Sequence, residues 1–316
     1  MQPKSSQDLV SVLDFSYEEV ASLFNAAARL KKEGKSSKEK TLSGKTLAII
    51  LQKPSTRTTV SFAAGMAQLG GTPLILNSQD LQLKRGESLA DTARTLSGYV
   101  DGVMIRAYKQ EDIAELAGHA SIPIINGLSD QEHPCQILSD LFTIFELKNC
   151  KNLGDLKRIK IAYVGDGNNV AHSLILIAAL LGMKIAVASP KNYEPEKDMV
   201  KKGEDLAKER GAKIEVTQDP KSAVAGADIV YTDVWASMGK DEEREHRKQL
   251  FMPYQVNAEL LAAASPGARV MHCLPAHRGE EITEELMEGP QSIIFLQAEN
   301  RLHVQKAILL KLLAEP

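Results

Sequence analysis

The run LAIILQKPSTRTT, residues 47–59, places a short apolar segment directly before a group of hydroxyl and basic residues. Leu47–Leu51 has the length and composition of a buried strand, and Pro54 prevents that strand from continuing. The hydroxyl residues from Ser55 onward can cap the start of a helix. A buried strand that passes directly into a helix is the building unit of a parallel α/β sheet.

Short apolar runs of the same kind recur along the chain, with segments of helical period between them. They occupy residues 74–76, 103–105 and 122–125 in the first half, and residues 159–164, 185–188, 214–216, 229–231, 270–274 and 293–296 in the second. Such runs are typical of parallel strands covered on both faces. The sequence therefore predicts an α/β fold of two doubly wound parallel-sheet domains with an interdomain cleft. Ligands are expected at the carboxyl ends of strands that face the cleft.

Helix and loop signals divide the chain. Ser16 and Glu19 form a capping box, and the amphipathic helix that they start ends at Gly34. A second long helix is expected over residues 134–148, and a polar stretch rich in Asn, Lys and Gly follows it. We expect one domain over residues 1–148, another over 149–298, and a C-terminal helical segment over 299–316.

Composition excludes several classes of protein. The 316 residues are 43% hydrophobic and 25% charged, which excludes disordered, collagen-like and disulfide-scaffold chains. The net charge of −3 argues against bulk binding to nucleic acid or anionic lipid. Three widely spaced cysteines indicate a reducing compartment, and residues 1–7 lack the apolar core of a signal peptide. The longest apolar run, Leu174–Met183, is about half of a membrane span. We expect a cytoplasmic protein with no membrane or nucleic-acid partner.

Three short motifs suggest chemistry that their surroundings do not support. Gly44-Lys45-Thr46 resembles the end of a phosphate-binding P-loop, but Glu39 stands where that loop needs glycine. Gly165-Asp166-Gly167 resembles a dinucleotide fingerprint, yet the following strand ends without an acidic residue to bind ribose. His272, Cys273 and His277 have no paired ligand spacing elsewhere. No cofactor and no metal are expected.

Polar residues at predicted strand ends of the first half form a candidate anion site. Helix-start amides, the hydroxyls of residues 55–58 and the guanidinium of Arg57 suit a phosphate group. Arg106 ends the strand at 102–105, and His133-Pro134-Cys135-Gln136 begins a helix after the next strand. A neutral imidazole and an amide there could contact a carbonyl oxygen and an NH2 group.

The second half carries a candidate amine site. Asp233 ends a buried strand, and the glycine-bearing loop Trp235-Ala236-Ser237-Met238-Gly239 follows it. His272-Cys273-Leu274-Pro275 ends the next strand. Because no nucleophile–base pair is recognisable, these residues favour direct transfer from a phosphate-bearing carbonyl compound to a cationic amine.

Together these motifs closely resemble those of the transcarbamoylase family, over essentially the whole chain. Ser-Thr-Arg-Thr at 55–58 and His-Pro-Cys-Gln at 133–136 resemble the family's carbamoyl phosphate signatures. Asp-Val-Trp-Ala-Ser-Met-Gly at 233–239 is similar to the loop with which ornithine-specific members bind ornithine, which aspartate-specific members lack. His-Cys-Leu-Pro at 272–275 is similarly diagnostic.

The resemblance implies a transferase of amino-acid biosynthesis, in which the first domain binds carbamoyl phosphate, the second binds ornithine and the last helix packs back on the first. The implied carbamoyl phosphate residues are Ser55, Thr56, Arg57, Thr58, Gln82, Arg106, His133, Gln136, Cys273, Leu274 and Arg301. The implied ornithine residues are Asn169, Asp233, Ser237 and Met238, and the implied catalytic residues are Arg57, Arg106, His133, Asp233 and Cys273. It also implies a homotrimer in which Gln82 reaches a neighbouring subunit's site, with further assembly of trimers left open.

The resemblance has two departures. The family usually has a second arginine at position 59, where this chain has Thr59, and a glycine at position 84, where it has Lys84.

The expected reaction converts carbamoyl phosphate and L-ornithine to L-citrulline and phosphate, with either Cys273, Asp233 or the phosphate accepting the proton of the δ-amine. The alternatives are a transcarbamoylase for another amine, a non-catalytic binder of phosphorylated metabolites and a dehydrogenase.

Overall fold

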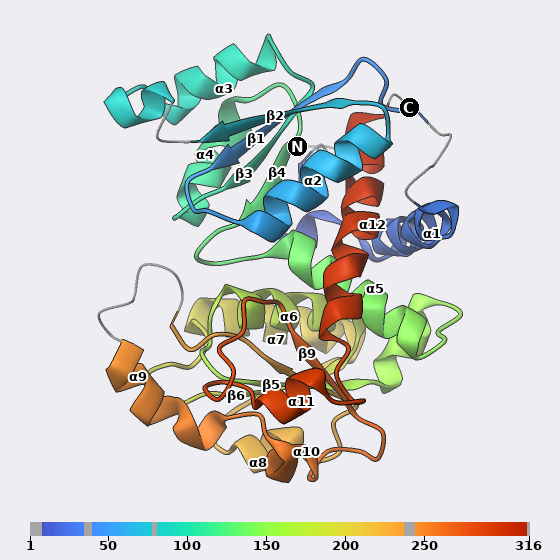
Figure 1. The fold of residues 1–316 in the computed structure, drawn as a ribbon, viewed down its shortest axis with the longest axis vertical. Coiled ribbons are helices and arrows are strands. Elements are labelled where there is room, and N and C mark those ends of the chain that lie inside the picture. The colour runs from blue at the N-terminus through green and yellow to red at the C-terminus, as the bar shows by residue number, and fades with distance from the viewer. Residues whose placement is uncertain (1–7, 35–39, 78–80, 237–243, 315–316) are drawn as a thin grey trace. The chain divides into compact units, whose positions relative to one another are not determined.

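The computed structural model describes residues 8–34, 40–77, 81–236 and 244–314. The chain forms two compact units: unit 1 comprises Met1–Phe142 with Glu299–Pro316, and unit 2 comprises Thr143–Ala298 (Figure 1). The division falls within helix α5 (Pro134–Leu147), a few residues before the polar stretch at 148–156.

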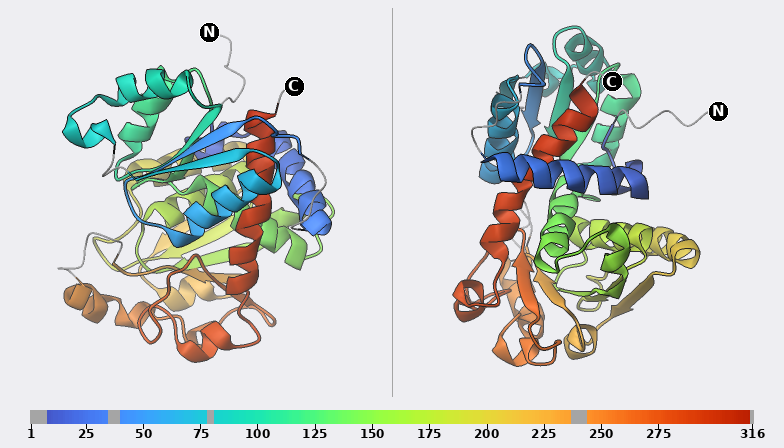
Figure 2. Two further views of the ribbon diagram at one scale, coloured as in Figure 1. Left: turned by 45° about the horizontal axis from the view of Figure 1, so that its top comes forward. Right: turned by 90° about the vertical axis from the view of Figure 1, so that its right-hand side faces the viewer.

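Unit 1 is built on a parallel four-stranded sheet in the order β2-β1-β3-β4. Its strands are β1 (Thr46–Leu51), β2 (Thr72–Asn77), β3 (Gly102–Arg106) and β4 (Ile124–Leu128). Its helices are α1 (Tyr17–Glu33), α2 (Thr56–Gln68), α3 (Leu89–Ser97) and α4 (Gln110–His119), with short 3-10 turns at Val12–Asp14 and Gln82–Arg85. Side chains of α3 and α4 join those of β1, β3 and β4 in one buried cluster. Helix α2 lies along β1 and β2 (Figure 2).

Unit 2 is built on a parallel five-stranded sheet in the order β7-β6-β5-β8-β9. Its strands are β5 (Lys160–Val164), β6 (Lys184–Ala188), β7 (Lys213–Thr217), β8 (Ile229–Thr232) and β9 (Arg269–His272). Its helices are α6 (Asn169–Leu181), α7 (Lys197–Arg210), α8 (Pro220–Val224), α9 (Arg244–Phe251), α10 (Ala258–Leu261) and α11 (Glu284–Glu288), with 3-10 turns at Leu153–Arg158 and Met252–Tyr254. The predicted class, two α/β units with parallel sheets, is confirmed.

Local sequence explains several boundaries. Ser16 and Glu19 form the expected capping box at the start of α1, and Gly34 ends that helix with a φ of 73°. The apolar run at 174–183 lies mostly in α6, whose residues from Val170 to Leu181 are all buried in unit 2. Among the described residues, no helix is both long and apolar enough to cross a membrane.

The prediction of a strand at residues 293–296 is wrong. Ile293 makes one backbone hydrogen bond to Val270 of β9, and helix α12 (Ile294–Leu313) then begins. A short apolar run does not by itself distinguish a strand from the first turn of a buried helix. Helix α12 thus starts five residues before the C-terminal helical segment that was expected from residue 299.

Candidate functional site

The polar residues of unit 1 gather where the order of its sheet reverses. The chain forms β1 first, adds β2 on one side and then β3 and β4 on the other, so the switch point lies between β1 and β3. Ser55–Thr58 follow the carboxyl end of β1, and Arg106 is the last residue of β3. Ligands of doubly wound sheets bind at this position.

Helix α2 begins as predicted from its hydroxyl residues. Ser55 is its N-cap, and the Ser55 Oγ accepts a hydrogen bond from the Thr58 amide at 3.3 Å. Thr59, where the family usually has arginine, donates from its hydroxyl to the Ser55 carbonyl at 2.6 Å. The start of α2 combines the positive end of a helix dipole with hydroxyl groups, which is an anion-binding arrangement.

Arg301 of α12 joins the two predicted carbamoyl phosphate motifs. Its Nη2 donates to the Thr58 hydroxyl at 2.7 Å and its Nη1 donates to Gln136 Oε1 at 2.8 Å. Gln136 in turn donates from Nε2 to Asp140 at 2.8 Å. Arg301 itself is buried in unit 1. Thr58 and Gln136 are therefore held in fixed orientations.

Three arginines of unit 1 act together on the His133 side chain. Burial lowers the pKa of His133 well below its usual value, and the positive charges of Arg301, Arg106 and Arg57 lower it further. The imidazole is uncharged at neutral pH, so it can donate one hydrogen bond without adding charge. Three guanidinium groups around a neutral donor suit a ligand that carries several negative charges and a carbonyl oxygen.

Unit 2 has its own switch point, between β5 and β8. Asp233, which directly follows β8, is buried and accepts three hydrogen bonds. The donors are Asn168 Nδ2 at 2.8 Å, the Val234 amide at 2.8 Å and the Cys273 thiol at 3.0 Å. The structure thus brings Asp233 and Cys273 together, although they are 40 positions apart in the sequence. The carboxylate of Asp233 can attract a cationic amine.

The loop after β5 contains a residue that sequence reasoning missed. The prediction named Asn169, which is the first residue of α6, but it is Asn168 that caps the helix and contacts Asp233. Asn before a helix is an N-cap signal that could have identified it. Gly167 is required there, because a Cβ would lie 2.2 Å from the Pro195 nitrogen.

Arg247 of α9 was also missed by sequence reasoning, because the charged residues around it are typical of a solvent-exposed helix. Only 4% of its surface is exposed. Its Nη1 donates to Asp166 at 3.1 Å and to the Trp235 carbonyl at 2.7 Å, and its guanidinium lies 4.6 Å from the Tyr193 ring centre. Arg247 therefore anchors the described start of the predicted ornithine loop to the loop after β5.

The other predicted substrate-binding residues are only partly placed by the structure. Gln82 begins the exposed 3-10 turn of unit 1, and Leu274 lies in the left-handed region with a φ of 61°. Ser237 and Met238 lie outside the described residues. Burial raises the pKa of the Cys135 thiol to about 12, so this neighbour of His133 is protonated and unreactive at neutral pH. Asp233, His272 and Cys273 also present ligand atoms within 4.8 Å of one another, which is close enough to share a metal ion.

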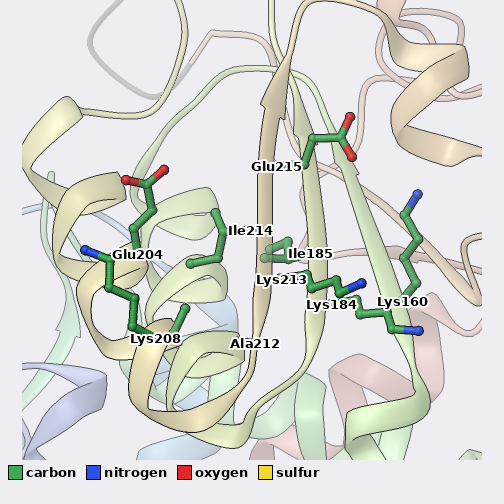
Figure 3. Close-up of a pocket in the computed structure, with 10 residues that line it drawn as sticks. Lys160, Lys184, Ile185, Glu204, Lys208, Ala212, Lys213, Ile214 and Glu215 are labelled. Carbon is green, nitrogen blue, oxygen red and sulfur yellow. The ribbon is translucent and has the colours of Figure 1, made fainter.

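A groove of about 710 Å³ in unit 2 contains none of the predicted site residues (Figure 3). It lies at the amino ends of β5, β6 and β7, where Lys160, Lys184 and Lys213 are in register on neighbouring strands. This is the opposite edge of the sheet from Asp233. Since ligands of doubly wound sheets bind at strand carboxyl ends, the groove is not the candidate site.

Family models, curated relatives and solved structures all match this chain to carbamoyltransferases over nearly its whole length. Residues 7–146 match the model for the carbamoyl-P binding domain of aspartate/ornithine carbamoyltransferases, and residues 157–312 match the model for the Asp/Orn binding domain. The ornithine carbamoyltransferase of Anoxybacillus flavithermus is 54% identical over 97% of this chain and 96% of its own length. An anabolic ornithine carbamoyltransferase of Pyrococcus furiosus is 51% identical, covering 96% of each chain. The solved Pyrococcus furiosus structure superposes with a TM-score of 0.93 at 49% identity, covering 99% of this chain and 98% of that one.

Proposed function

Because the chain belongs to the aspartate/ornithine carbamoyltransferase family, we infer that it transfers the carbamoyl group of carbamoyl phosphate to the δ-amine of L-ornithine. The products are L-citrulline and phosphate, in arginine biosynthesis. The observation in this chain that best supports the reaction is the combined effect of Arg57, Arg106 and Arg301 on the neutral His133. We assign carbamoyl phosphate to unit 1 and ornithine to unit 2.

Unit 1 is proposed to stabilise the leaving phosphate. Arg57, Arg106 and the first amides of α2 would neutralise its charge as the bond between the carbamoyl carbon and the phosphate oxygen breaks. Ser55 and Thr56 would contribute their hydroxyls, and Gln82 would come from a neighbouring subunit.

The carbamoyl group is proposed to lie against His133 and Gln136. Its oxygen gains negative charge as the amine attacks, and donors from His133, Thr58 and Arg106 would stabilise that charge. Arg301 already orients Thr58 and Gln136 at 2.7 and 2.8 Å, so these groups need little rearrangement. Such prior ordering lowers the cost of reaching the transition state.

Unit 2 is proposed to bind ornithine through Asp233, Asn169, Ser237 and Met238, with Cys273 and Leu274 close to the reacting carbon. The δ-amine must lose a proton to attack, because an alkylammonium has a pKa near 10.4 in water. The Cys273 thiol donates to Asp233 at 3.0 Å. Asp233 can therefore orient the amine or accept its proton directly, and Cys273 can accept that proton if its own thiol proton passes to Asp233. The leaving phosphate is the third candidate acceptor.

A choice of amines tests the assignment directly. We expect citrulline formation with ornithine, and at most about 1% of that rate with aspartate, putrescine or N-acetylornithine. Asp233 would repel the extra carboxylate of aspartate. Equal rates with ornithine and any other amine would contradict the assigned substrate, and no phosphate release with any of them would favour a non-catalytic binder.

We also propose a homotrimer with shared sites, in a cytoplasmic location. The face of unit 1 formed by α2 and the edge strand β2 supports an interface, since it exposes the apolar side chains of Val60, Leu74 and Ile75. Exposed apolar groups on an edge strand favour association with another chain. Gln82 follows this strand closely, which supports its reach into a neighbouring site. The cytoplasmic location rests on the three widely spaced cysteines, none of which forms a disulfide within the described residues.

Subunit mixing tests the shared site. Arg57→Ala and Gln82→Ala chains are each expected to be nearly inactive. When they are unfolded together and reassembled, mixed trimers are expected to recover activity, because some sites then combine an intact Arg57 with an intact Gln82. Mixed trimers that are confirmed by mass but stay as inactive as both parents would place Gln82 in its own chain's site.

A further inference from the structure

Three side chains of the segment after β9 lie close together outside the residues assigned to either substrate. His277, Glu280 and Glu281 each offer one potential metal ligand, and their ligand atoms all lie within 4.8 Å of one another. All three belong to unit 2. An imidazole with two carboxylates is a common donor set for divalent transition metals.

Glu281 is the fixed member of this group, because its side chain is fully buried. Its Oε1 accepts two hydrogen bonds, from His272 Nε2 at 3.0 Å and from the His277 amide at 2.6 Å. The Leu274 amide donates to His272 Nδ1 at 2.8 Å, so the ring proton lies on Nε2 and points at Glu281. The orientation of the carboxylate is therefore set by two donors on one oxygen.

The other carboxylate oxygen of Glu281 has no hydrogen-bond donor among the described residues. Oε2 is buried and accepts no hydrogen bond from any residue that the structure describes. A buried carboxylate oxygen without a donor destabilises the folded protein, because it has lost its hydrogen bonds to water. It lies 3.8 Å from His277 Nδ1, too far for a hydrogen bond. Two ligands of one tetrahedral zinc ion lie roughly 3.3–3.4 Å apart when each bond is about 2.0–2.1 Å, so a small rotation of the partly exposed His277 ring would bring the pair to that distance.

The rest of the cluster is held in place and open to solvent. Gln255 donates from Nε2 to the carbonyls of Gly279 at 3.1 Å and Glu280 at 2.9 Å, which fixes the backbone of the segment. Lys248 lies 3.7 Å from the Glu280 carboxylate, as an ion pair at the edge of the group. The His277 side chain is 40% exposed, so an ion can reach the site from solvent.

We propose that His277, Glu280 and Glu281 bind a first-row divalent transition metal ion, represented by Zn²⁺, with water completing its coordination. The buried Oε2 of Glu281 gains a partner, and the hydrogen bonds on Oε1 orient it as the outer contacts of metal-binding carboxylates do. This site shares no ligand with the Asp233–His272–Cys273 group, although the hydrogen bond from His272 to Glu281 joins the two. It does not depend on the carbamoyl transfer reaction.

Zinc titration of the full chain tests the site. The protein is stripped with a chelator and carries Cys273→Ser, which removes the thiol of the other candidate group. Calorimetry is expected to show one equivalent of Zn²⁺, and His277→Gln in this background is expected to weaken its binding at least tenfold. The matched control is His246→Gln, an exposed histidine of α9 in the same unit, which should leave the affinity unchanged.

Cobalt gives a second readout that does not depend on activity. Co²⁺ in the Cys273→Ser protein should show ligand-field absorption without a thiolate charge-transfer band, and His277→Gln should remove that absorption. Because His277 is partly exposed, its replacement should leave the circular dichroism spectrum unchanged. Absence of saturable metal binding in the Cys273→Ser protein, or equal binding after His277→Gln, overturns the proposal.

Discussion

Arg57→Lys is expected to lower kcat roughly 10²–10³-fold at saturating substrates, because lysine keeps the charge but loses the planar fork of donors. Arg57 follows β1 at the switch point, and its charge acts on His133 together with those of Arg106 and Arg301. A single ammonium cannot replace two parallel hydrogen bonds to phosphate oxygens. The effect should appear in kcat as well as in kcat/KM, because the leaving phosphate gains charge in the transition state.

Steady-state phosphate release measures this effect, and Arg94→Lys is its control. Arg94 lies on α3 of the same unit in an exposed ion pair with Asp91, where the exchange should change kcat less than twofold. If Arg57→Lys keeps more than about half of the wild-type kcat while Arg94→Lys behaves as expected, Arg57 does not contact the leaving group.

Asp233→Asn is expected to lower kcat/KM for ornithine about a hundredfold while carbamoyl phosphate binding changes less than threefold. Loss of one partner of a buried, hydrogen-bonded charge pair costs about 2–5 kcal/mol, or roughly 30-fold to several thousandfold. Asparagine also places an NH2 group where Asp233 now accepts from Asn168, the Val234 amide and Cys273, so at least one of these contacts is lost. Calorimetry with each substrate and initial rates with ornithine give both values.

The two ends of β8 supply a matched pair of carboxylates for this test. Asp228 directly precedes the strand and contacts Lys148 at 3.1 Å, while Asp233 directly follows it. Asp228→Asn should leave both substrates unaffected, because it lies at the amino end of the sheet, away from the proposed site. Equal losses for ornithine and carbamoyl phosphate in Asp233→Asn would show that Asp233 maintains the fold rather than binds the amine.

The fold was predictable wherever a strand was buried on both faces. The runs at 47–51 and 103–105 are apolar throughout because they lie in β1 and β3, the central strands of the sheet, which are buried on both faces. The run at 293–296 is equally apolar, but most of it forms the first turn of α12. Its secondary structure is decided by the twenty residues of that helix and not by four apolar side chains.

The candidate site was predictable where its residues directly follow strands. Arg106 and Asp233 could be placed from local sequence because a polar residue after a buried strand emerges at the carboxyl edge of the sheet. Arg247 could not, because its burial depends on Asp166, 81 positions earlier in the chain. Arg301 came only from family resemblance, since no local pattern brings it to Thr58, which is 243 positions away.

The return of the chain to unit 1 through α12 has a consequence for folding during synthesis. Glu299 and the residues after it belong to unit 1, and Arg301 completes the contacts of Thr58 and Gln136. Gly65 of α2 also packs against Lys306 and Leu309 of this helix. Domains of a nascent chain usually fold in the order in which they leave the ribosome. Here the unit that begins first must wait for the last helix to be translated, so unit 2 can complete its fold before unit 1 does.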